Sequence, residues 1–449
     1  MIPKRVSHFQ TFHPSSLDNQ RYSRRRFLYS SSMAAGTILF GAPFIARGQS
    51  LNEKLNIGMI GVNGKGNDNL RGLSSENIVA LCDVDGNSLD KAAAQHPKAR
   101  TYRDFRKLLE QKDLDAVVVT IPDHCHAVAS SAAIKLGRHV YCEKPLTHSV
   151  YEARQLTLAA RAHKVATQMG NSGHSSEALR QAVEWVQAGV VGAIREVHCW
   201  SNRPIWPQGI SRPAETPPVP KHIDWDLWIG PAPMRPFHPA YHPFNWRGWW
   251  DFGTGALGDM GCHIIDAAFW ALDLGAPSAV EAESSGVNEE TAPKWSIVRY
   301  QFPARGARPA VRLTWHDGGK LPPTELTELP AGQKLSDNGT LFIGEKGKLL
   351  FERGRPLRLV SQPKDFQPPP KVISRSIGHY AEWIAACKGG PPAGSNFNHA
   401  GPLTEMVLLG NVALRAGRRI EWDAEKLRVS NLPEAARFVR REYRTGWAL

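Results

Sequence analysis

The sequence is poor in cysteine, with six residues among 449. They are scattered along the chain and lack the clustered spacing that a disulfide framework or a zinc site needs. Cys82 and Cys142 each stand in an apolar, strand-like run, where a small buried thiol is the ordinary interpretation. We therefore expect reduced, mostly buried thiols and no bound metal. The six are Cys82, Cys125, Cys142, Cys199, Cys262 and Cys387.

Long hydrophobic runs are also missing. The apolar stretch 33–46 is short and rich in glycine, serine and alanine, so an integral membrane protein is not expected. It follows the motif Ser-Arg-Arg-Arg-Phe-Leu at 23–28, and the two together resemble a twin-arginine export signal. The resemblance implies cleavage near Gly48, a signal peptide over residues 1–49, and export of the folded protein by the twin-arginine machinery. The expected location is periplasmic or otherwise extracytoplasmic.

The chain also lacks a basic surface of the kind that binds nucleic acid. Its formal net charge is +13, but residues 1–49 hold seven Lys and Arg against Asp18 alone. No basic run interleaved with aromatic residues follows residue 50. Nucleic-acid binding is therefore not expected.

At 449 residues the chain exceeds what one hydrophobic core normally serves, so two domains are expected after the leader. From 51 to 175, short apolar runs alternate with stretches of helical periodicity. This alternation predicts an α/β domain of the Rossmann type, a doubly wound parallel sheet with right-handed connections. The expected strands are 55–62, 78–82, 115–121, 139–142 and 165–169, and the expected helices are 88–95, 103–110, 124–136 and 151–163.

A glycine-rich turn follows the first expected strand. Its glycines allow a tight bend and let backbone amides approach a pyrophosphate at the start of the next helix. The fingerprint is imperfect, because Asn63 stands where G-x-G-x-x-G has glycine. Asp83, at the end of the second strand, can accept hydrogen bonds from a ribose and repels a 2′-phosphate, which favours NAD over NADP. The turn residues predicted to bind cofactor are Gly61, Asn63, Gly64, Lys65 and Gly66.

Two more loops follow strands that deliver ligand contacts at their carboxyl ends: Thr-Ile-Pro-Asp-His at 120–124 and Cys-Glu-Lys-Pro at 142–145. A strand ending in Glu-Lys-Pro, with Pro-Asp-His one strand earlier, resembles the Gfo/Idh/MocA family of glucose-fructose oxidoreductase and inositol dehydrogenase. The likeness extends over nearly the whole mature chain. It implies further cofactor contacts from Thr120, Pro122, His124, Glu143 and Lys144.

The motif Asp259-x-x-x-His263 resembles the family's catalytic segment, which opens a helix beside the nicotinamide. Residues four apart share one helix face, so both side chains can point into one cleft. The resemblance implies a catalytic set of Lys144, Asp259 and His263, the imidazole moving a proton. Other interpretations stay open: a surface lysine, a helix-capping aspartate and a packing histidine. A metal held by Asp259, His263 and His174 has no further ligand spacing to support it.

From 176 to 449 a long helix, 176–188, precedes strands that look antiparallel and half exposed. The family likeness implies an α+β substrate domain with a large, mostly antiparallel open sheet, which often mediates oligomers, so a homo-oligomer is expected. Residues 376–449 are expected to complete this domain. The expected strands are 194–202, 280–285, 297–302, 311–315, 340–343 and 348–351.

Seven tryptophans lie between residues 200 and 250, mixed with proline, histidine and arginine. Aromatic faces suit the C–H patches of sugars, while arginine and histidine can bind hydroxyls. About half of these tryptophans are expected to be core or subunit contacts instead. The residues predicted to contact a carbohydrate substrate are Trp206, His222, Arg247 and Trp249, together with Asn171 and His174 in the loop after the last strand of the first domain.

Three functions remain open. The first is a sugar or polyol dehydrogenase with a tightly bound nicotinamide cofactor. The second is a redox-neutral glycoside hydrolase, in which oxidation, elimination, hydration and reduction leave the cofactor unchanged. The third is a non-catalytic sugar-binding protein on the same scaffold.

Overall fold

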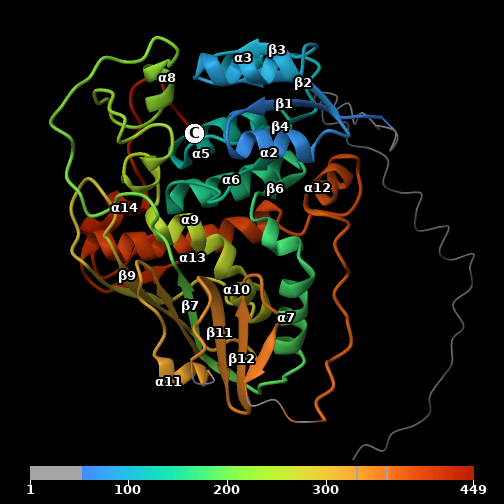
Figure 1. Cartoon of the computed structure of the whole chain (residues 1–449), viewed down its shortest axis with the longest axis vertical. Coiled ribbons are helices and arrows are strands. Elements are labelled where there is room, and N and C mark those ends of the chain that lie inside the picture. Colours follow the sequence, from blue (N-terminus) through green and yellow to red (C-terminus); the bar gives the residue numbers. More distant parts are fainter. Residues whose placement is uncertain (1–52, 330–331, 361–362, 364) are drawn as a thin grey trace, which may run out of the picture. The chain divides into compact units, whose positions relative to one another are not determined.

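The computed structural model describes residues 53–329, 332–360, 363 and 365–449, so the predicted signal peptide lies outside the described residues. Two sheets organise the described chain (Figure 1). Within it, no helix combines the length and the apolar character that crossing a membrane requires. The predicted fold class is confirmed, a parallel Rossmann sheet followed by a larger mixed sheet.

The first sheet has six parallel strands in the order β3-β2-β1-β4-β5-β6. Five of them were predicted. The sixth, β3, was missed because its three residues are exposed or half exposed at the sheet edge and carry no apolar run. The strands are β1 (Asn56–Ile60), β2 (Asn77–Cys82), β3 (Arg100–Tyr102), β4 (Ala116–Val119), β5 (His139–Cys142) and β6 (Thr167–Met169).

Helices cover both faces of this sheet, which explains its unbroken apolar strands. In β4, Val117 and Val119 join the cluster that includes residues of α5 and α6, whereas Ala116 and Val118 face the opposite cluster with α2 and α3. Side-chain caps from Asp85, Asp104 and Ser149 fix the starts of three helices. The helices are α2 (Lys65–Gly72), α3 (Gly86–Gln95), α4 (Phe105–Leu109), α5 (Asp123–Lys135) and α6 (Val150–His163).

The second sheet has nine strands in the order β13-β12-β11-β7-β10-β9-β8-β14-β15. Its pairs are antiparallel except β7 with β10. Strand β9 alternates buried and half-buried residues, as expected of a sheet with one covered face. The strands are β7 (Ile194–Ser201), β8 (Ala279–Ser284), β9 (Ser296–Phe302), β10 (Val311–His316), β11 (Asn338–Gly344), β12 (Gly347–Glu352), β13 (Arg358–Val360), β14 (Ile420–Asp423) and β15 (Arg428–Val429).

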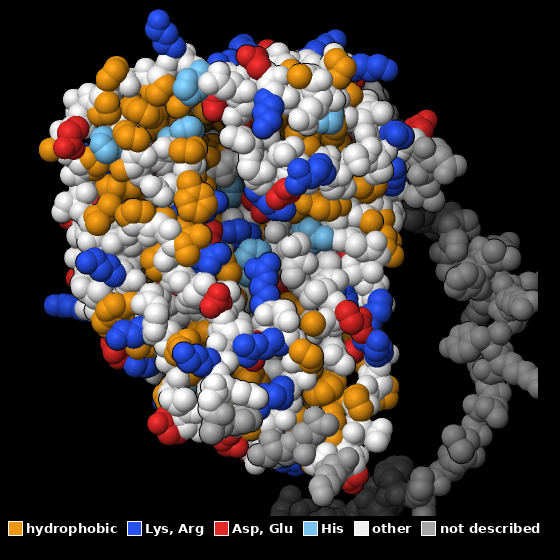
Figure 2. Space-filling view, in the orientation of Figure 1, with side chains coloured by type: hydrophobic (Ala, Val, Ile, Leu, Met, Phe, Trp, Pro, Cys, Tyr) orange, Lys and Arg blue, Asp and Glu red, His pale blue; other side chains and the backbone are white. Residues whose placement is uncertain are grey.

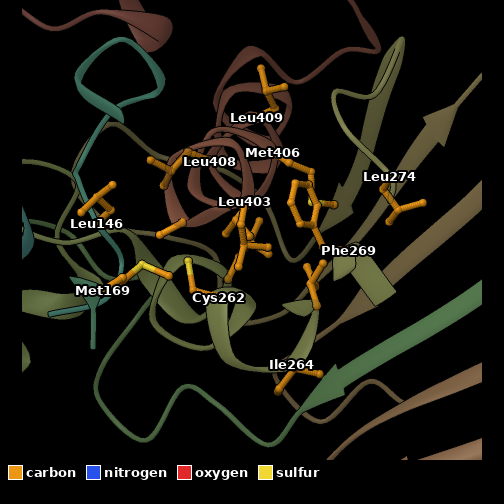
Figure 3. Packing of buried hydrophobic residues seen from close by; sticks show 14 of the residues in the cluster. Leu146, Met169, Cys262, Ile264, Phe269, Leu274, Leu403, Met406, Leu408 and Leu409 are labelled. Atoms are coloured by element: carbon orange, nitrogen blue, oxygen red, sulfur yellow. The ribbon is translucent and has the colours of Figure 1, made fainter. Parts of the chain in front are cut away.

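Helix α13 (Phe397–Ala416) runs between α6 and the second sheet and joins the two halves into one core (Figure 1). Leu403 and Met406 of α13 pack in one cluster with Cys262 of α9, and Leu146 and Met169 from the first domain belong to the same cluster (Figure 3). The remaining helices are η1 (Ser172–Ser175), α7 (Glu177–Gln187), α8 (Trp225–Ile229), η2 (Asn245–Gly248), α9 (Gly255–Ile264), α10 (Asp266–Ala271), α11 (Thr324–Thr327), α12 (His379–Cys387), η3 (Pro433–Ala435) and α14 (Ala436–Val439).

Helix α12 lies against the first sheet and not against the second. Trp383 and Cys387 belong to the buried cluster of Ile57 and Met59 in β1, and Tyr380 donates a hydrogen bond to Asn69 Oδ1 at 2.7 Å. Residues 376–449, expected to complete the second domain alone, therefore also complete the first.

Candidate functional site

A cavity of 430 Å³ opens where the parallel strands end. It is lined by the loops that follow β1, β2, β4 and β5, because carboxyl ends of parallel strands meet at one edge of the sheet. Figure 2 shows basic, acidic and histidine side chains gathered in a recess near the middle of the face that is turned toward the viewer. The predicted cofactor residues that line the cavity are Gly61, Asn63, Gly64, Lys65, Asp83, Thr120, Pro122, Glu143 and Lys144.

The glycine turn is built for close backbone approach. Gly61 has a φ of 87°, and a Cβ there would lie 2.1 Å from the carbonyl oxygen of Thr120. A Cβ on Gly66 would lie 2.3 Å from the carbonyl oxygen of Gly61, so this glycine lets α2 start directly against the turn. Gly64 faces open space. The turn and the start of α2 therefore fit a pyrophosphate, which backbone amides would hold.

Asp83 stands beside this turn at the end of β2. Its Oδ2 accepts a hydrogen bond from the amide of Val62 at 3.0 Å, and its Oδ1 accepts one from the amide of Asp85 at 2.9 Å. Burial raises the pKa of Asp83 although these amides oppose the shift. The carboxylate lines the cavity. Its place at the end of the second strand is the one at which dinucleotide-binding folds carry the residue that accepts hydrogen bonds from the ribose.

Lys144 and Asp259 are brought together from the two domains. Lys144 Nζ lies 2.7 Å from Asp259 Oδ1 and donates a second hydrogen bond to the Asp259 carbonyl oxygen at 2.9 Å. Arg247 Nε, from η2, lies 3.4 Å from the same carboxylate oxygen. Burial would raise the pKa of Asp259, but the charges of Lys144 and Arg247 outweigh it and hold the pKa below its usual value. The carboxylate is therefore ionised at neutral pH.

His263 follows Asp259 by one turn of α9, as the spacing predicts. Its side chain is partly exposed, and no hydrogen-bond partner for it occurs among the described residues. Burial, followed by the charge of Lys144, lowers the pKa of His263 to about 3. The imidazole is thus neutral at neutral pH, and His263 is not among the residues that line the cavity, whereas Lys144 is.

Asp123, a residue that the sequence analysis did not select, lines the same cavity beside Lys144. Thr254 donates a hydrogen bond to its Oδ2 at 2.7 Å. Burial raises the pKa of Asp123 to about 7, although Thr254, Lys144 and Arg247 oppose the shift. The signal that could have found it is its place in the Pro-Asp-His loop, directly after β4.

Three predicted contact residues lie in the interior instead. His124 has no exposed surface, and its ring nitrogens lie 3.2 and 3.0 Å from the carbonyl oxygens of Phe252 and Trp228. Trp249 is 1% exposed and its indole donates to Ala240 O, so it belongs to the aromatic cluster under the 223–252 segment. Trp206 is also buried and donates to Gln208. For these three the prediction is corrected: they support the site and do not line it.

His222 is not among the residues that line the cavity and lies beside Asp85 and Arg103, which are. Its Nε2 is 4.0 Å from Asp85, and its carbonyl oxygen accepts hydrogen bonds from Gly86 N and the Arg103 guanidinium. Of the two predicted substrate contacts, His222 therefore lies near Asp85, whereas Arg247 lies beside Asp259.

Asn171 and His174 meet in a buried polar cluster around Asp266. Asp266 Oδ2 accepts from His174 Nδ1 at 2.9 Å and from Asn171 Nδ2 at 3.0 Å, while Oδ1 accepts from His399 Nε2 at 2.7 Å. Burial alone would raise the pKa of Asp266, but the two histidines hold it far below its usual value. The ligand atoms of these three side chains lie within 4.8 Å of one another, near enough for one metal ion, but the hydrogen bonds already account for the spacing.

The wall opposite the strand ends was only partly foreseen. It comes from the segment 225–247 and from the far end of the chain. No local pattern marks these residues, because each reaches the cavity through long-range packing. The lining residues not selected from the sequence include Asp85, Ser88, Arg103, Asp104, Phe105, Asp123, His126, Leu227, Trp228, His242, Phe244, Trp246 and Trp447.

Comparison with known proteins agrees with this geometry. Residues 55–171 match the model of the Gfo/Idh/MocA family described as "Oxidoreductase family, NAD-binding Rossmann fold", and residues 193–309 match the one described as "Oxidoreductase family, C-terminal alpha/beta domain". The two matches together span just over half of the chain. The protein belongs to the Gfo/Idh/MocA family of NAD-binding oxidoreductases.

Two curated relatives show how far the sequence likeness extends. An inositol 2-dehydrogenase of Salmonella paratyphi B is 29% identical over 32% of this chain and 45% of that protein. A levoglucosan dehydrogenase of Pseudarthrobacter phenanthrenivorans is 26% identical over 43% of this chain and 41% of that protein. The chain thus spans less than half the length of these relatives.

Solved structures extend the likeness in fold. The WlbA dehydrogenase of Bordetella pertussis, in complex with NADH and UDP-GlcNAcA, has a TM-score of 0.59 at 17% identity and covers 83% of this chain and 99% of its own. A levoglucosan dehydrogenase in complex with NADH and levoglucosan has a TM-score of 0.56 at 17% identity, with coverages of 82% and 99%. At such identities the comparison establishes the shared architecture.

Proposed function

We propose that the protein oxidises a carbinol of a sugar, polyol or glycoside by hydride transfer to a tightly held NAD. The observation that carries the proposal is the ion pair of Lys144 with Asp259, 2.7 Å apart, with His263 one helical turn beyond. Names of relatives and neighbours add support, because inositol, levoglucosan and a UDP-sugar derivative are all polyhydroxylated.

Each member of this set has a distinct task. When bound, NAD supplies the ring that accepts the hydride from the carbinol carbon. The hydroxyl proton must leave as the carbon–oxygen double bond forms, and we assign its acceptance to His263, which lies one turn of α9 beyond Asp259. Lys144 Nζ has one donor left beyond its two bonds to Asp259 and can bind the reacting oxygen. Asp259, held ionised, keeps Lys144 and Arg247 in place.

NAD is preferred over NADP in this proposal because Asp83 places a half-buried carboxylate on the cavity wall, where it would meet the ribose. The preference is tested by measuring both dissociation constants by NADH and NADPH fluorescence. NADPH should bind at least about tenfold more weakly, a difference of about 1.4 kcal/mol. Equal or tighter NADPH binding would contradict the role given to Asp83.

The reaction is tested with a panel of sugars and glycosides, nicotinamide absorbance and product masses. His263→Ala should lower kcat at least about a hundredfold, the range of a lost general base, while nucleotide affinity changes little. His163→Ala, at the end of α6, is the matched control and should leave kcat unchanged. Net oxidation gives a keto product together with reduced cofactor.

Release of an aglycone with no net reduction of the cofactor would identify the redox-neutral glycoside hydrolase instead. Sugar binding without turnover, the same in wild type and His263→Ala, would overturn the enzymatic proposal.

We also propose export by the twin-arginine route, which Arg24→Lys with Arg25→Lys should abolish. A secreted fraction that does not change in that double variant would refute it.

A further inference from the structure

The nine residues that follow Arg440, numbers 441–449, form what we call the strap. They begin two residues after α14 and return to the first domain, and the end of the chain lies beside α5 and α8 in Figure 1. The strap therefore crosses from the second domain to the mouth of the nucleotide cavity. Its contacts fall into three groups.

The first group ties the strap to α5 and α6. Arg441 Nε lies 2.9 Å from Glu152 Oε1, and its guanidinium also donates to the carbonyl oxygen of His124. Tyr443 donates to the same Glu152 oxygen at 2.7 Å. Glu152 is 1% exposed, so these are buried, charge-assisted bonds. At the far end, Lys135 Nζ donates to the carbonyl oxygen of Leu449 at 2.8 Å.

The second group ties the strap to the segment 225–247, which forms the outer wall of the cavity. Arg444 donates from its backbone amide to Pro231 O at 3.0 Å and from Nε to Gly230 O at 3.1 Å. Its Nη1 lies 2.5 Å from Asp226 Oδ1. One arginine thus fixes the turn after α8 to the strap.

The third group places a tryptophan on the cavity wall. Trp447 lines the cavity, with its ring centroid 6.0 Å from that of Phe105 and the Arg106 guanidinium 4.8 Å from its ring. Phe105 and its neighbours Arg103 and Asp104 line the end of the cavity near Asp83. Trp447 is half buried.

We propose that the strap retains the cofactor, with Trp447 as a nucleotide-binding residue at the adenosine end of the cavity. The inference rests on the proposed function, since it needs a dinucleotide in the cavity. Trp447 lines the cavity beside Phe105. The strap that carries it is fixed by Arg441 to the first domain and by Arg444 to the segment 225–247. A tryptophan that contacts the bound nucleotide should therefore slow its dissociation more than its association, because contacts made after docking act mainly on the release rate.

The test measures NADH release by stopped flow, with excess NAD as the competitor and nicotinamide fluorescence as the signal. Trp447→Ala should raise the release rate about tenfold, equal to 1.4 kcal/mol, and leave the association rate within about twofold. Trp295→Ala is the matched control, because Trp295 is also half buried but does not line the cavity. An unchanged release rate in Trp447→Ala would overturn the proposal.

Arg444→Ala provides the second variant, since it loosens the strap without altering the cavity wall. It should raise the release rate by severalfold, while Arg440→Ala, whose guanidinium stacks on Tyr151 outside the strap, should not. Equal rates in both arginine variants would refute the role of the strap even if Trp447→Ala had failed to fold. Wild-type protein that binds no NADH at all would instead refute the proposed function.

Discussion

Asp123 offers the sharpest test of the electrostatics of the site. Its carboxyl is 4% exposed, and burial raises its pKa from 3.8 to about 7. Each pKa unit corresponds to 1.36 kcal/mol, so ionising Asp123 in the folded protein costs about 4 kcal/mol. Asp123→Asn removes this cost and keeps an oxygen that can accept the hydrogen bond of Thr254.

The sign follows from comparing proton binding in the two states. Below pH 4 the carboxyl is protonated both folded and unfolded, and Asp123 contributes no pH dependence. Between pH 4 and 7 the unfolded chain has released the proton while the folded protein retains it, so the free energy of unfolding falls as pH rises. Above pH 7 Asp123 is ionised in both states, and the free energy of unfolding falls no further on its account. Asp123→Asn should therefore raise the free energy of unfolding by about 2–4 kcal/mol at pH 8 and change it little at pH 4.5.

The assay is urea unfolding of nucleotide-free protein at both pH values, followed by tryptophan fluorescence. Nucleotide must be absent because a ligand bound to the folded state would add its own stabilisation. Asp68→Asn is the control: Asp68 is exposed and pairs with Arg71 at the surface, so its effect should stay within about 1 kcal/mol at either pH. If Asp123→Asn gave the same change at pH 4.5 and pH 8, the shifted pKa would be refuted.

Two further substitutions test the construction of the fold around the site. Gly61→Ala should abolish NADH binding and lower the free energy of unfolding by about 3 kcal/mol or more, because the new Cβ would lie 2.1 Å from Thr120 O. Retained NADH binding in fluorescence titrations would count against a close approach of the turn's backbone to the pyrophosphate. Asp266→Asn should lower the free energy of unfolding at pH 7 by about 1–3 kcal/mol, since the single oxygen of an amide cannot accept from both His174 and His399 and a buried donor loses its partner. A change under about 0.5 kcal/mol in urea unfolding would show that the cluster is not stabilising.

The strands and loops of the first domain could be predicted because their signals are local. The apolar run of β4 predicts a buried strand, and the structure has a buried strand there. The parallel order of the strands then places Gly61, Asp83 and Lys144 at one edge of the sheet. The Asp259 and His263 pair was equally accessible, because four-residue spacing fixes a helix face. In each case a short segment carries its own geometry.

Residue type was a weaker guide where packing decides. His124 and Trp249 have side chains typical of ligand sites, yet each is buried and satisfied by backbone carbonyl oxygens. Asp123, next to His124 in the chain, faces the cavity instead. Which of two neighbouring residues faces the ligand depends on the helix that starts there and on the 223–252 segment packed over it, and neither is encoded by the loop itself.

The cavity also shows why the cofactor and the two domains are expected to act as one unit. Its walls come from strand-end loops of the first domain, from the segment 225–247 and from Trp447, so no single segment forms a closed site. A ligand that contacts all three would stabilise the folded state by RT ln(1 + [L]/Kd), in addition to the packing of α13 that already joins the two domains. Arg444 joins two of those walls, because it ties the strap that carries Trp447 to the segment 225–247.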